Sequence, residues 1–466
     1  MNGEKGPGAR LQVISHYPIG QGQKPQMMTN GLAAGKQQTR CLIGETIRQR
    51  SLARGKDVRA YRQRIRLALL RLLACFTAPL IPRSSSLVLH PSSILLIRPD
   101  HIGDLLFTTP ALRALRAAFP QAYIAYLAGP WARAIVENNP HIDEVIVCEC
   151  PGFTRRPKAS FLEPYTLLLK YARRLRRRNF DLAINLRFDF WWGALLAYLA
   201  GIRQRVGYDI AECRPFLTEA VPHTKGKHEV EQNLTLIEAV TNGLRNMHDS
   251  NKALTDETIC QVAGRQGTGG KGQVRLEFEP TGEEREFAAH YLFERGVEEG
   301  DKLICIHPGA GAPVKLWRRE GFAQVADVLA QRHGVRVILT GSERERPLVQ
   351  AIADGMREAP IVAAGDLALG QLAAVMERCS LVLGVDSGPL HLAVAMGTPT
   401  VHLYGPVDHR AFGPWGDPAR HLVLLADLDC IPCNRLDYPP KELADHPCVR
   451  LISVEQVLAA CERLIG

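Results

Sequence analysis

The stretch LVLGVDSGPLH, residues 381–391, decides the fold that we expect for this chain. Its first five residues form an apolar run typical of a buried parallel strand. The polar turn after them opens a helical segment with Pro389 at the first helical position, where its missing N–H costs nothing. Such a helix start offers free N–H groups and partial positive charge to an anion, and Gly388 lets a ligand approach the backbone. The stretch therefore predicts a strand, a turn and a helix that bind a phosphate.

Chain length and charge distribution limit the class of protein in which this phosphate site lies. A chain of 466 residues is long for one core and predicts two domains with additional segments. Residues 1–90 carry a net charge of +12, whereas the rest of the chain carries −3. A nearly neutral body argues against an enzyme that binds nucleic acid in a basic groove, so no nucleic-acid partner is expected.

The basic N-terminal extension, residues 1–90, divides into two parts. Residues 1–40 are rich in Gly, Gln and Pro and are predicted to be disordered. Residues 57–81 alternate arginine with leucine and predict an amphipathic helix for an anionic membrane surface, although a helix packed on a domain has the same pattern. We find neither an apolar run of about 20 residues near this helix nor a secretory signal. We therefore expect a cytoplasmic protein, peripheral on the inner face of the membrane, with reduced cysteines.

The body repeats one design twice. Short apolar runs alternate with helical stretches, which indicates parallel α/β sheets. A polar, glycine-rich stretch at 246–273 separates the halves and predicts domains at 91–270 and 271–466, with the last helix as a candidate to pack back on the first domain. The predicted strands lie at 93–98, 122–127, 144–148 and 181–186, and then at 302–306, 335–339, 380–385 and 400–404.

Three loops at strand ends of the second half carry groups that suit a nucleotide diphosphate. The loop 307–317 offers Gly309 for close backbone approach and the Lys315 ammonium for a phosphate oxygen. The loop 340–345 offers carboxylates for ribose hydroxyls, and the third loop is 386–391. Each has a plainer interpretation as solvated lysine, helix caps or a packing histidine. Their convergence at one sheet edge predicts the nucleotide site.

The first half supplies one further candidate. Asp104 follows Gly103 at a predicted helix start, where an acid caps the helix or favours its dipole. The same position faces the second domain, where a carboxylate takes a proton from a hydroxyl group.

Several of these motifs together resemble glycosyltransferase family 9, the ADP-heptose:lipopolysaccharide heptosyltransferases. They are IRPDHIGDLLFTTPAL at 97–112, KHE at 227–229, KLW at 315–317, GVDSGPLH at 384–391 and YGP at 404–406. The resemblance covers roughly residues 92–465, and residues 1–90 have no counterpart in the family pattern. It implies the GT-B architecture, in which two Rossmann-like domains face each other across a cleft. The N-terminal domain then binds the acceptor and the C-terminal domain binds the nucleotide sugar.

Carried over residue by residue, the resemblance implies an inverting reaction that needs no cofactor or divalent metal. Asp104 matches the proposed general base and Lys315 the phosphate-binding lysine, while Glu345 matches the ribose contact, with Glu343 as the competing register. Donor contacts are implied for Gly309, Lys315, Trp317, Glu345, Asp386, Ser387, Gly388 and His391. The donor is an ADP-linked heptose and the acceptor a lipid-linked glycan of the lipopolysaccharide core or a related surface glycan.

Candidate contacts to that acceptor are Arg98, Gly103, Arg173 and Arg177, the last two in the basic stretch 155–178, which suits a solvated helix equally well. Near the C-terminus, Cys430, Cys433, His446 and Cys448 have the residue types of a zinc site but irregular spacing, and we predict no metal.

Two other functions share the predicted architecture. A UDP-sugar 2-epimerase would convert its nucleotide sugar without an acceptor, and a non-catalytic scaffold would bind the nucleotide sugar alone. Product analysis separates these from a transferase.

Overall fold

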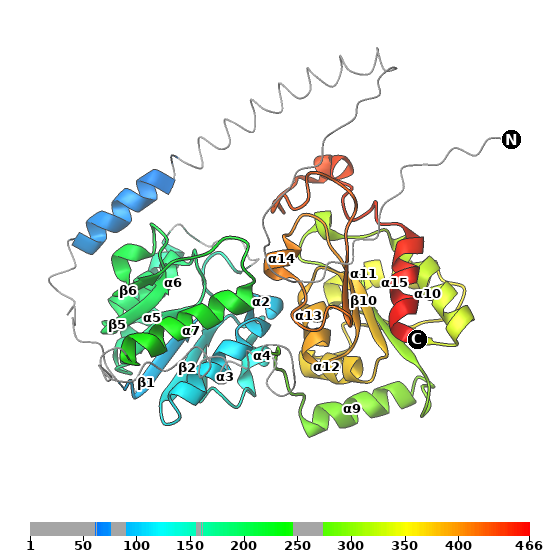
Figure 1. Ribbon diagram of the computed structural model, residues 1–466, viewed down its shortest axis with the longest axis horizontal. Helices are drawn as coiled ribbons and strands as arrows, with labels where there is room; N and C mark the ends of the chain where they lie inside the picture. Colours follow the sequence, from blue (N-terminus) through cyan, green and yellow to red (C-terminus); the bar gives the residue numbers. More distant parts are fainter. Residues whose placement is uncertain (1–60, 62, 76–89, 155–159, 161, 246–273) are drawn as a thin grey trace, which may run out of the picture.

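The computed structural model describes residues 61, 63–75, 90–154, 160, 162–245 and 274–466. They form two domains of the same design (Figure 1), each built on a six-stranded sheet in which all neighbouring strands are parallel. The strand orders are β3-β2-β1-β4-β5-β6 and β12-β11-β10-β7-β8-β9. Counted from the first strand of each domain, both sheets have the doubly wound order 3-2-1-4-5-6. The predicted α/β class with two Rossmann-like domains is confirmed. The strands are β1 (Ser93–Ile97), β2 (Tyr123–Ala128), β3 (Glu144–Val147), β4 (Leu182–Asn185), β5 (Gln204–Tyr208), β6 (Glu219–Val221), β7 (Leu303–His307), β8 (Arg336–Gly341), β9 (Ile361–Ala364), β10 (Leu381–Val385), β11 (Thr400–Leu403) and β12 (His421–Leu424).

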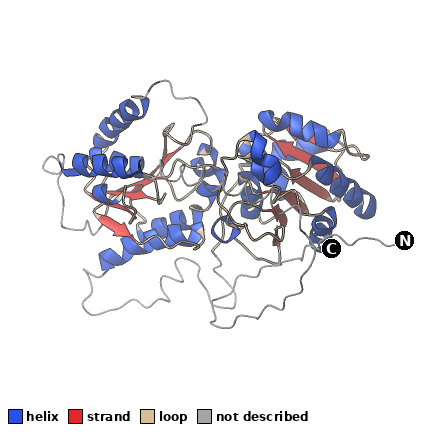
Figure 2. Ribbon diagram, turned by 90° about the horizontal axis from the view of Figure 1, so that it is seen from above, coloured by secondary structure: helices blue, strands red, loops and turns tan. Residues whose placement is uncertain are grey.

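Helices cover both faces of the first sheet, because its central strands are apolar on both sides (Figure 2). Leu95 and Ile97 of β1 pack with α5 and α6, whereas Ile94 and Leu96 pack with the helices on the other face. The helices of this domain are α2 (Ile102–Leu106), α3 (Thr109–Ala118), α4 (Arg133–Glu137), α5 (Glu163–Arg176), α6 (Trp191–Leu199) and α7 (Glu229–Arg245).

The second domain has the same three layers, with α9, α12 and α13 on one face and α10, α11 and α15 on the other. Val457 and Cys461 of the last helix are buried with Phe322 of α10. The prediction that this helix packs back on the first domain is wrong, because its apolar face is needed to cover the second sheet. The helices are α9 (Gly282–Phe293), α10 (Arg319–His333), α11 (Arg346–Ala353), α12 (Leu369–Glu377), α13 (Gly388–Ala395), α14 (His409–Phe412) and α15 (Val454–Ile465).

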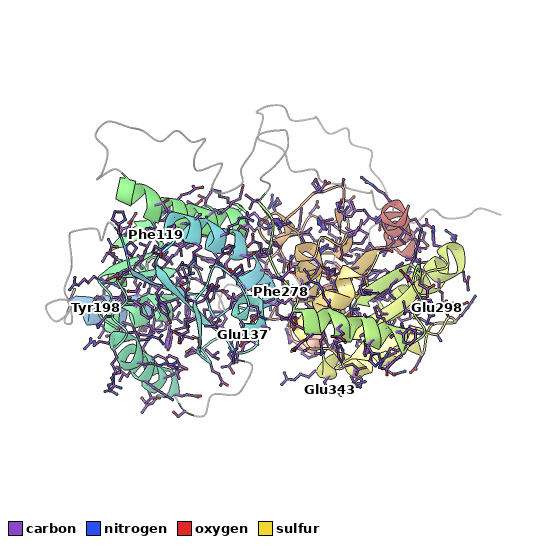
Figure 3. All side chains as sticks on the ribbon, turned by 90° about the horizontal axis from the view of Figure 1, so that it is seen from below. Phe119, Glu137, Tyr198, Phe278, Glu298 and Glu343 are labelled. Atoms are coloured by element: carbon purple, nitrogen blue, oxygen red, sulfur yellow. The ribbon has the colours of Figure 1, made fainter. Side chains whose placement is uncertain are left out.

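The two domains share one apolar core, which runs from the first sheet through Val274 and Leu276 to α9, α12 and α13. The backbone N–H of Glu277 donates to Thr109 Oγ1 at 2.8 Å, and Trp415 Nε1–H donates to the carbonyl of Val274 at 2.9 Å. Figure 3 shows Phe278 between the two domains. The chain therefore stays on the first domain as far as residue 277, while the predicted boundary at residue 270 lies outside the described residues.

Part of the basic extension forms a helix at residue 61 and residues 63–75, within the predicted 57–81. The predicted disordered segment, residues 1–40, lies outside the described residues. Among the helices that the structure describes, none combines the length and apolar character that crossing a bilayer would demand.

Candidate active site

The predicted reactive residues lie where ligands bind in doubly wound sheets. In each sheet the strand order reverses next to the first strand, between β1 and β4 and between β7 and β10. Asp104 follows β1, Lys315 follows β7 and Asp386 follows β10. All three therefore lie beyond the carboxyl ends of strands at the two switch points.

Helices α2 and α13 bring these two switch points together (Figure 1), and glycine makes their contact possible. A methyl group built on Gly103 of α2 would lie 2.9 Å from His391 Cδ2. One built on Gly388 of α13 would lie 2.8 Å from Ile102 Cβ. Only residues without a side chain allow this approach. Gly103, a predicted acceptor contact, thus faces the other domain.

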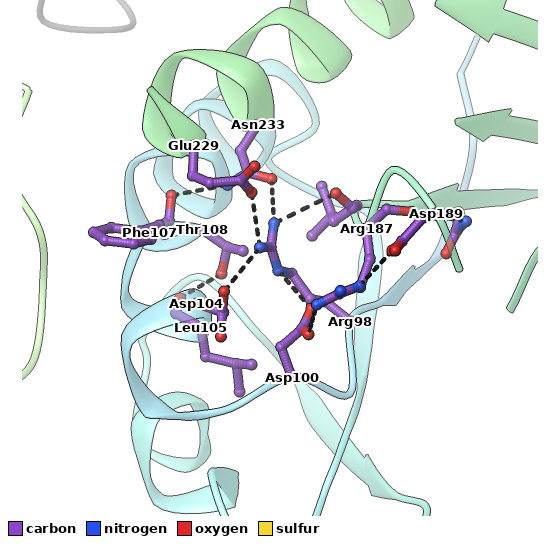
Figure 4. Close-up of polar contacts among 12 residues, drawn as sticks. Arg98, Asp100, Asp104, Leu105, Phe107, Thr108, Arg187, Asp189, Glu229 and Asn233 are labelled. Carbon is purple, nitrogen blue, oxygen red and sulfur yellow. Dashed lines mark hydrogen bonds and ion pairs between the residues drawn. The ribbon is translucent and has the colours of Figure 1, made fainter. Parts of the chain in front are cut away.

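A buried guanidinium organises the carboxylates of the first domain (Figure 4). Arg98 is 2% exposed, with Nε 3.1 Å from Asp100 Oδ2 and Nη2 2.8 Å from Glu229 Oε2. Its Nη2 also lies 3.5 Å from Asp104 Oδ1, and its Nη1 donates to Asn233 Oδ1 at 3.0 Å. Arg98 therefore cannot contact an acceptor as predicted, because its side chain is enclosed by these partners.

Among the three carboxylates around Arg98, Asp104 alone has substantial access to solvent. Its side chain is 26% exposed, compared with 1% for Asp100 and 6% for Glu229. Burial raises the pKa of the Asp100 carboxyl to about 6, with a further rise from Asp104, against the lowering effects of Arg187 and Arg98. Arg187, from the loop after β4, forms an ion pair with Asp100. The network leaves Asp104 as the carboxylate that can meet a substrate.

The start of α7 connects this network to the second domain. Glu229 and Asn233 hold Arg98, and Asn233 Nδ2 also donates to the carbonyl of Phe107 at 3.1 Å. The neighbouring His228 accepts a hydrogen bond at Nδ1 from the backbone of Val230, so Nε2–H donates to the carbonyl of Gly413 at 3.1 Å. One turn of helix thus supports Asp104 and fixes the domain contact.

On the opposite side, Lys315 and the start of α13 gather positive charge. Lys315 Nζ lies 2.7 Å from Asp386 Oδ2 and donates to the Asp386 carbonyl at 3.2 Å, with 14% of its side chain exposed. Ser387 occupies the N-cap position without forming a side-chain cap. Its hydroxyl has no hydrogen-bond partner among the described residues. The expected capping role of the Ser387 side chain is therefore not seen, because its hydroxyl forms no hydrogen bond with the described residues.

His391 lies between the two groups. Its ring packs edge-on against Phe107 of the first domain, with centroids 4.7 Å apart, and Nδ1 has no hydrogen-bond partner in the described part of the chain. Burial lowers the pKa of His391 to about 4, and the charges of Asp386, Asp104 and Lys315 all act on the ring. The neutral imidazole is thus surrounded by the three predicted charged groups.

Glu345 and Glu343, the two candidates for the ribose contact, have different surroundings. Glu345 Oε2 accepts hydrogen bonds from Ser342 N at 2.8 Å and Ser342 Oγ at 2.7 Å, and its carboxylate fills the space beside Gly309. Glu343 is 70% exposed and paired with Arg346. The structure therefore favours Glu345 as the carboxylate that faces the predicted donor loop.

Two other predictions are not supported by the geometry. Trp317 is 4% exposed, and its Nε1–H donates to the carbonyl of Ile452 at 2.9 Å within the second core. Arg173 and Arg177 lie near the end of α5, where Arg178 pairs with Glu144 at the start of β3. That end of α5 is at the amino edge of the sheet, opposite to Asp104, so neither arginine can contact a sugar that reacts there.

The cysteine cluster near the C-terminus gives no metal geometry. Within the described ranges, no group of three or more His, Cys, Asp or Glu side chains is arranged to hold a metal ion. Cys433 Sγ lies 3.7 Å from the Tyr438 hydroxyl, and the Tyr438 ring packs on His446. These contacts indicate a packing role for the segment.

Solved structures of other proteins share the two-domain fold of this chain. The crystal structure of the glycosyl transferase family 9 from Veillonella parvula DSM 2008 is 29% identical, with a TM-score of 0.64, over 80% of this chain and 97% of that chain. The structure of Escherichia coli ADP-heptose lps heptosyltransferase II is 22% identical, with a TM-score of 0.60, over 80% and 98%. The chain therefore has the GT-B fold of glycosyltransferases.

The sequence comparison identifies the family. The model of glycosyltransferase family 9 (heptosyltransferase) matches residues 168–441, more than half of the chain. This protein belongs to glycosyltransferase family 9, as the resemblance implied, and is a glycosyltransferase. It is 28% identical to lipopolysaccharide heptosyltransferase 3 of Escherichia coli (strain K12) over 372 residues, 78% of this chain and 95% of the relative. It is 26% identical to lipopolysaccharide heptosyltransferase 2 of the same strain over 345 residues, 71% and 88% respectively.

Proposed function

We propose that this glycosyltransferase moves a heptose from ADP-heptose to an acceptor in the lipopolysaccharide core or a related cell-surface glycan. One observation carries the proposal: α2, which carries Asp104, packs against α13, and Lys315 pairs with Asp386 directly before the start of α13. The relatives named lipopolysaccharide heptosyltransferases 3 and 2 support heptose as the sugar and lipopolysaccharide as the acceptor.

The acceptor is activated by Asp104. Its carboxylate takes the proton of the acceptor hydroxyl while that oxygen attacks the anomeric carbon of the heptose. The bond from this carbon to the diphosphate breaks, and ADP leaves with the electron pair. A single displacement inverts the anomeric configuration. Arg98, held by Glu229 and Asn233, orients Asp104 without touching the substrate.

The departing diphosphate is stabilised by the second domain. Lys315 exchanges its ion pair with Asp386 for one with a phosphate oxygen, while N–H groups at the start of α13 and the Ser387 hydroxyl donate to others. This positive charge performs the task that a divalent metal performs in other transferases, and so we propose a metal-independent reaction. Glu345 accepts hydrogen bonds from the ribose.

Transfer by the full chain from ADP-heptose to lipopolysaccharide that lacks heptose tests the proposal. We expect product formation, which mass spectrometry detects. Asp104→Asn should lower kcat by about 10²- to 10⁴-fold with ADP affinity nearly unchanged. Glu137→Gln, an exposed acid on α4, is the matched control. An Asp104→Asn enzyme with the turnover of the control would refute the role of Asp104.

Two further measurements test the finer claims. Nuclear magnetic resonance of the product should show the anomeric configuration opposite to that of the donor, and retained configuration would exclude a single displacement. Transfer should continue after chelation of divalent metals. A panel of nucleotide sugars tests the donor, and preference for a UDP- or GDP-linked sugar would overturn the assignment of ADP-heptose.

A further inference from the structure

The helix at residues 63–75 turns one apolar face inward and another outward. Leu70 and Ala74 are 6% exposed and belong to the core on the α5–α6 face of the first sheet. Leu69 and Leu72, by contrast, are 60% and 53% exposed. With 3.6 residues per turn, the spacing of four, four and three residues places four exposed side chains on one outward ridge. The ridge consists of Tyr61, Ile65, Leu69 and Leu72.

Positive charge borders this ridge. Arg64 and Arg71 are exposed, and their positions on the helix place them along one side of the ridge. The sequence contains no Asp or Glu from residue 58 to residue 99. An apolar ridge with a basic border and no acidic residue is the pattern of a helix that lies in the plane of an anionic bilayer.

Helix α5 carries a second apolar ridge on the same layer of the domain, with one acidic residue, Glu163, in its first turn. Leu162, Tyr165 and Leu169 are 62%, 46% and 47% exposed, and their spacing of three and four residues puts them on one side. The side chains of Leu168 and Leu175 are buried in the core below. Lys170 and Arg173 are exposed beside this second ridge.

Both helices cover the same core layer and contact the first turn of α6, so their ridges lie on the outer side of that one layer. The Arg66 guanidinium lies over the Trp191 ring, 5.9 Å from its centroid, and Trp192 Nε1–H donates to the carbonyl of Pro164 at 3.2 Å. Figure 1 shows the helix at 63–75 on the side of the first domain away from the second. Eight of the thirteen exposed large apolar side chains in the described residues lie on these two helices, a concentration that marks an interaction surface.

We propose that this surface docks the enzyme on an anionic lipid bilayer. The occupant is a bilayer because arginine and lysine accompany both ridges, as lipid phosphates require, whereas a buried protein interface would be depleted of lysine. The first turn of α6 lies at the carboxyl edge of the sheet, the edge that carries Asp104. Docking would therefore present the acceptor domain to a glycan anchored in the same membrane. The inference goes beyond sugar transfer and does not require any particular donor.

Co-sedimentation of the full chain with vesicles tests the proposal, using phosphatidylcholine vesicles with and without phosphatidylglycerol. We expect binding to the anionic vesicles only. Leu69→Gln/Leu72→Gln should reduce the partition coefficient at least about tenfold, because two apolar side chains no longer enter the bilayer. Arg64→Gln/Arg71→Gln should reduce it about 30-fold, because each basic residue contributes to attraction by the anionic surface.

Matched variants on the second domain control for loss of apolar area and of charge. Phe293→Gln removes a side chain that is 73% exposed at the end of α9, and Arg357→Gln/Arg450→Gln removes two exposed arginines. Both should bind anionic vesicles like the wild type. Every variant should retain wild-type melting temperature and wild-type transfer to a water-soluble acceptor, because none of the residues lies near Asp104 or Lys315.

Three results would overturn the proposal. The first is equal binding of Leu69→Gln/Leu72→Gln and wild type to anionic vesicles, and the second is equal binding of wild type to neutral and anionic vesicles. The third is a wild-type dimer that the leucine variant converts to a monomer without any vesicle binding, which would make the surface a contact between two copies. Since sedimentation needs neither donor nor acceptor, failure of the proposed sugar transfer would leave this test unaffected.

Discussion

Replacing Gly388 by alanine would place one methyl group between the two domains. That carbon would lie 2.8 Å from Ile102 Cβ and 3.3 Å from the backbone nitrogen of Gly103. Carbon atoms in contact lie about 3.5–4.0 Å apart, so α2 and α13 must separate by about 1 Å. The added carbon points toward the first domain, and alanine is well tolerated in a helix. The expected consequence is a displaced domain rather than an unfolded one.

The separation moves Asp104 away from the diphosphate site, because α2 carries Asp104 and α13 begins at that site. A misplacement of about 1 Å in a reactive geometry costs about 100-fold in rate. This corresponds to about 2.7 kcal/mol in the activation free energy. We therefore expect kcat/KM to fall about 100-fold.

Steady-state transfer assays and calorimetric titration with ADP measure the two sides of this prediction. Gly282→Ala is the control, because Gly282 is likewise the first residue of its helix and a methyl group there would meet no atom within 4 Å. The Kd for ADP should change by less than about threefold in both variants. A Gly388→Ala enzyme as active as Gly282→Ala would refute the reasoning. A loss of ADP affinity as large as the loss of kcat/KM would assign the glycine to ligand approach instead.

Three other changes have defined outcomes. Lys315→Met should lower kcat by about 10²- to 10³-fold through lost stabilisation of the leaving group, and steady-state kinetics with unchanged kcat would contradict that role. Burial lowers the pKa of both His391 and His421 to about 4. Unfolding then takes up protons, so stability is complete above about pH 6.5 and falls by about 3 kcal/mol for each ring as the pH decreases to about 4. Urea midpoints at pH 7.5 and 5 measure this loss, and equal midpoints would count against it. Glu229→Gln should lower the free energy of unfolding by about 3 kcal/mol, because it removes a buried partner of Arg98; an unaltered urea midpoint would show that Arg98 does not depend on this carboxylate.

Strands that form continuous apolar runs were predictable, including the edge strand β3, whereas several other strands toward the sheet edges were not. Strands such as β1 and β10 are buried on both faces, so their sequences are continuous apolar runs that any window detects. The unpredicted strands are β5, β6, β9 and β12, toward the sheet edges. β6 has three residues, and β5 contains Gln204 and Arg205, so short length and polar side chains hide them.

Some residues of the candidate site were likewise predictable from the local sequence, and others were not. Asp104, Lys315 and Asp386 were found because the carboxyl ends of parallel strands are read directly from the alternation of apolar runs and helices. Arg98 was predicted to contact an acceptor, but its side chain is bound by Glu229, which lies 131 residues further along the chain. Trp317 stands two residues after Lys315 and yet faces the opposite way, into the second core.

The sequence by itself determined the two doubly wound domains and the loops that carry their chemistry, because apolar periodicity and helix-start signals are local. Tertiary structure alone decided which charges are buried, which glycines permit the contact between α2 and α13, and which apolar side chains of the helix at 63–75 remain outside. Those outcomes depend on the packing of segments that are far apart in the sequence. A local sequence pattern does not predict which of these segments pack against each other.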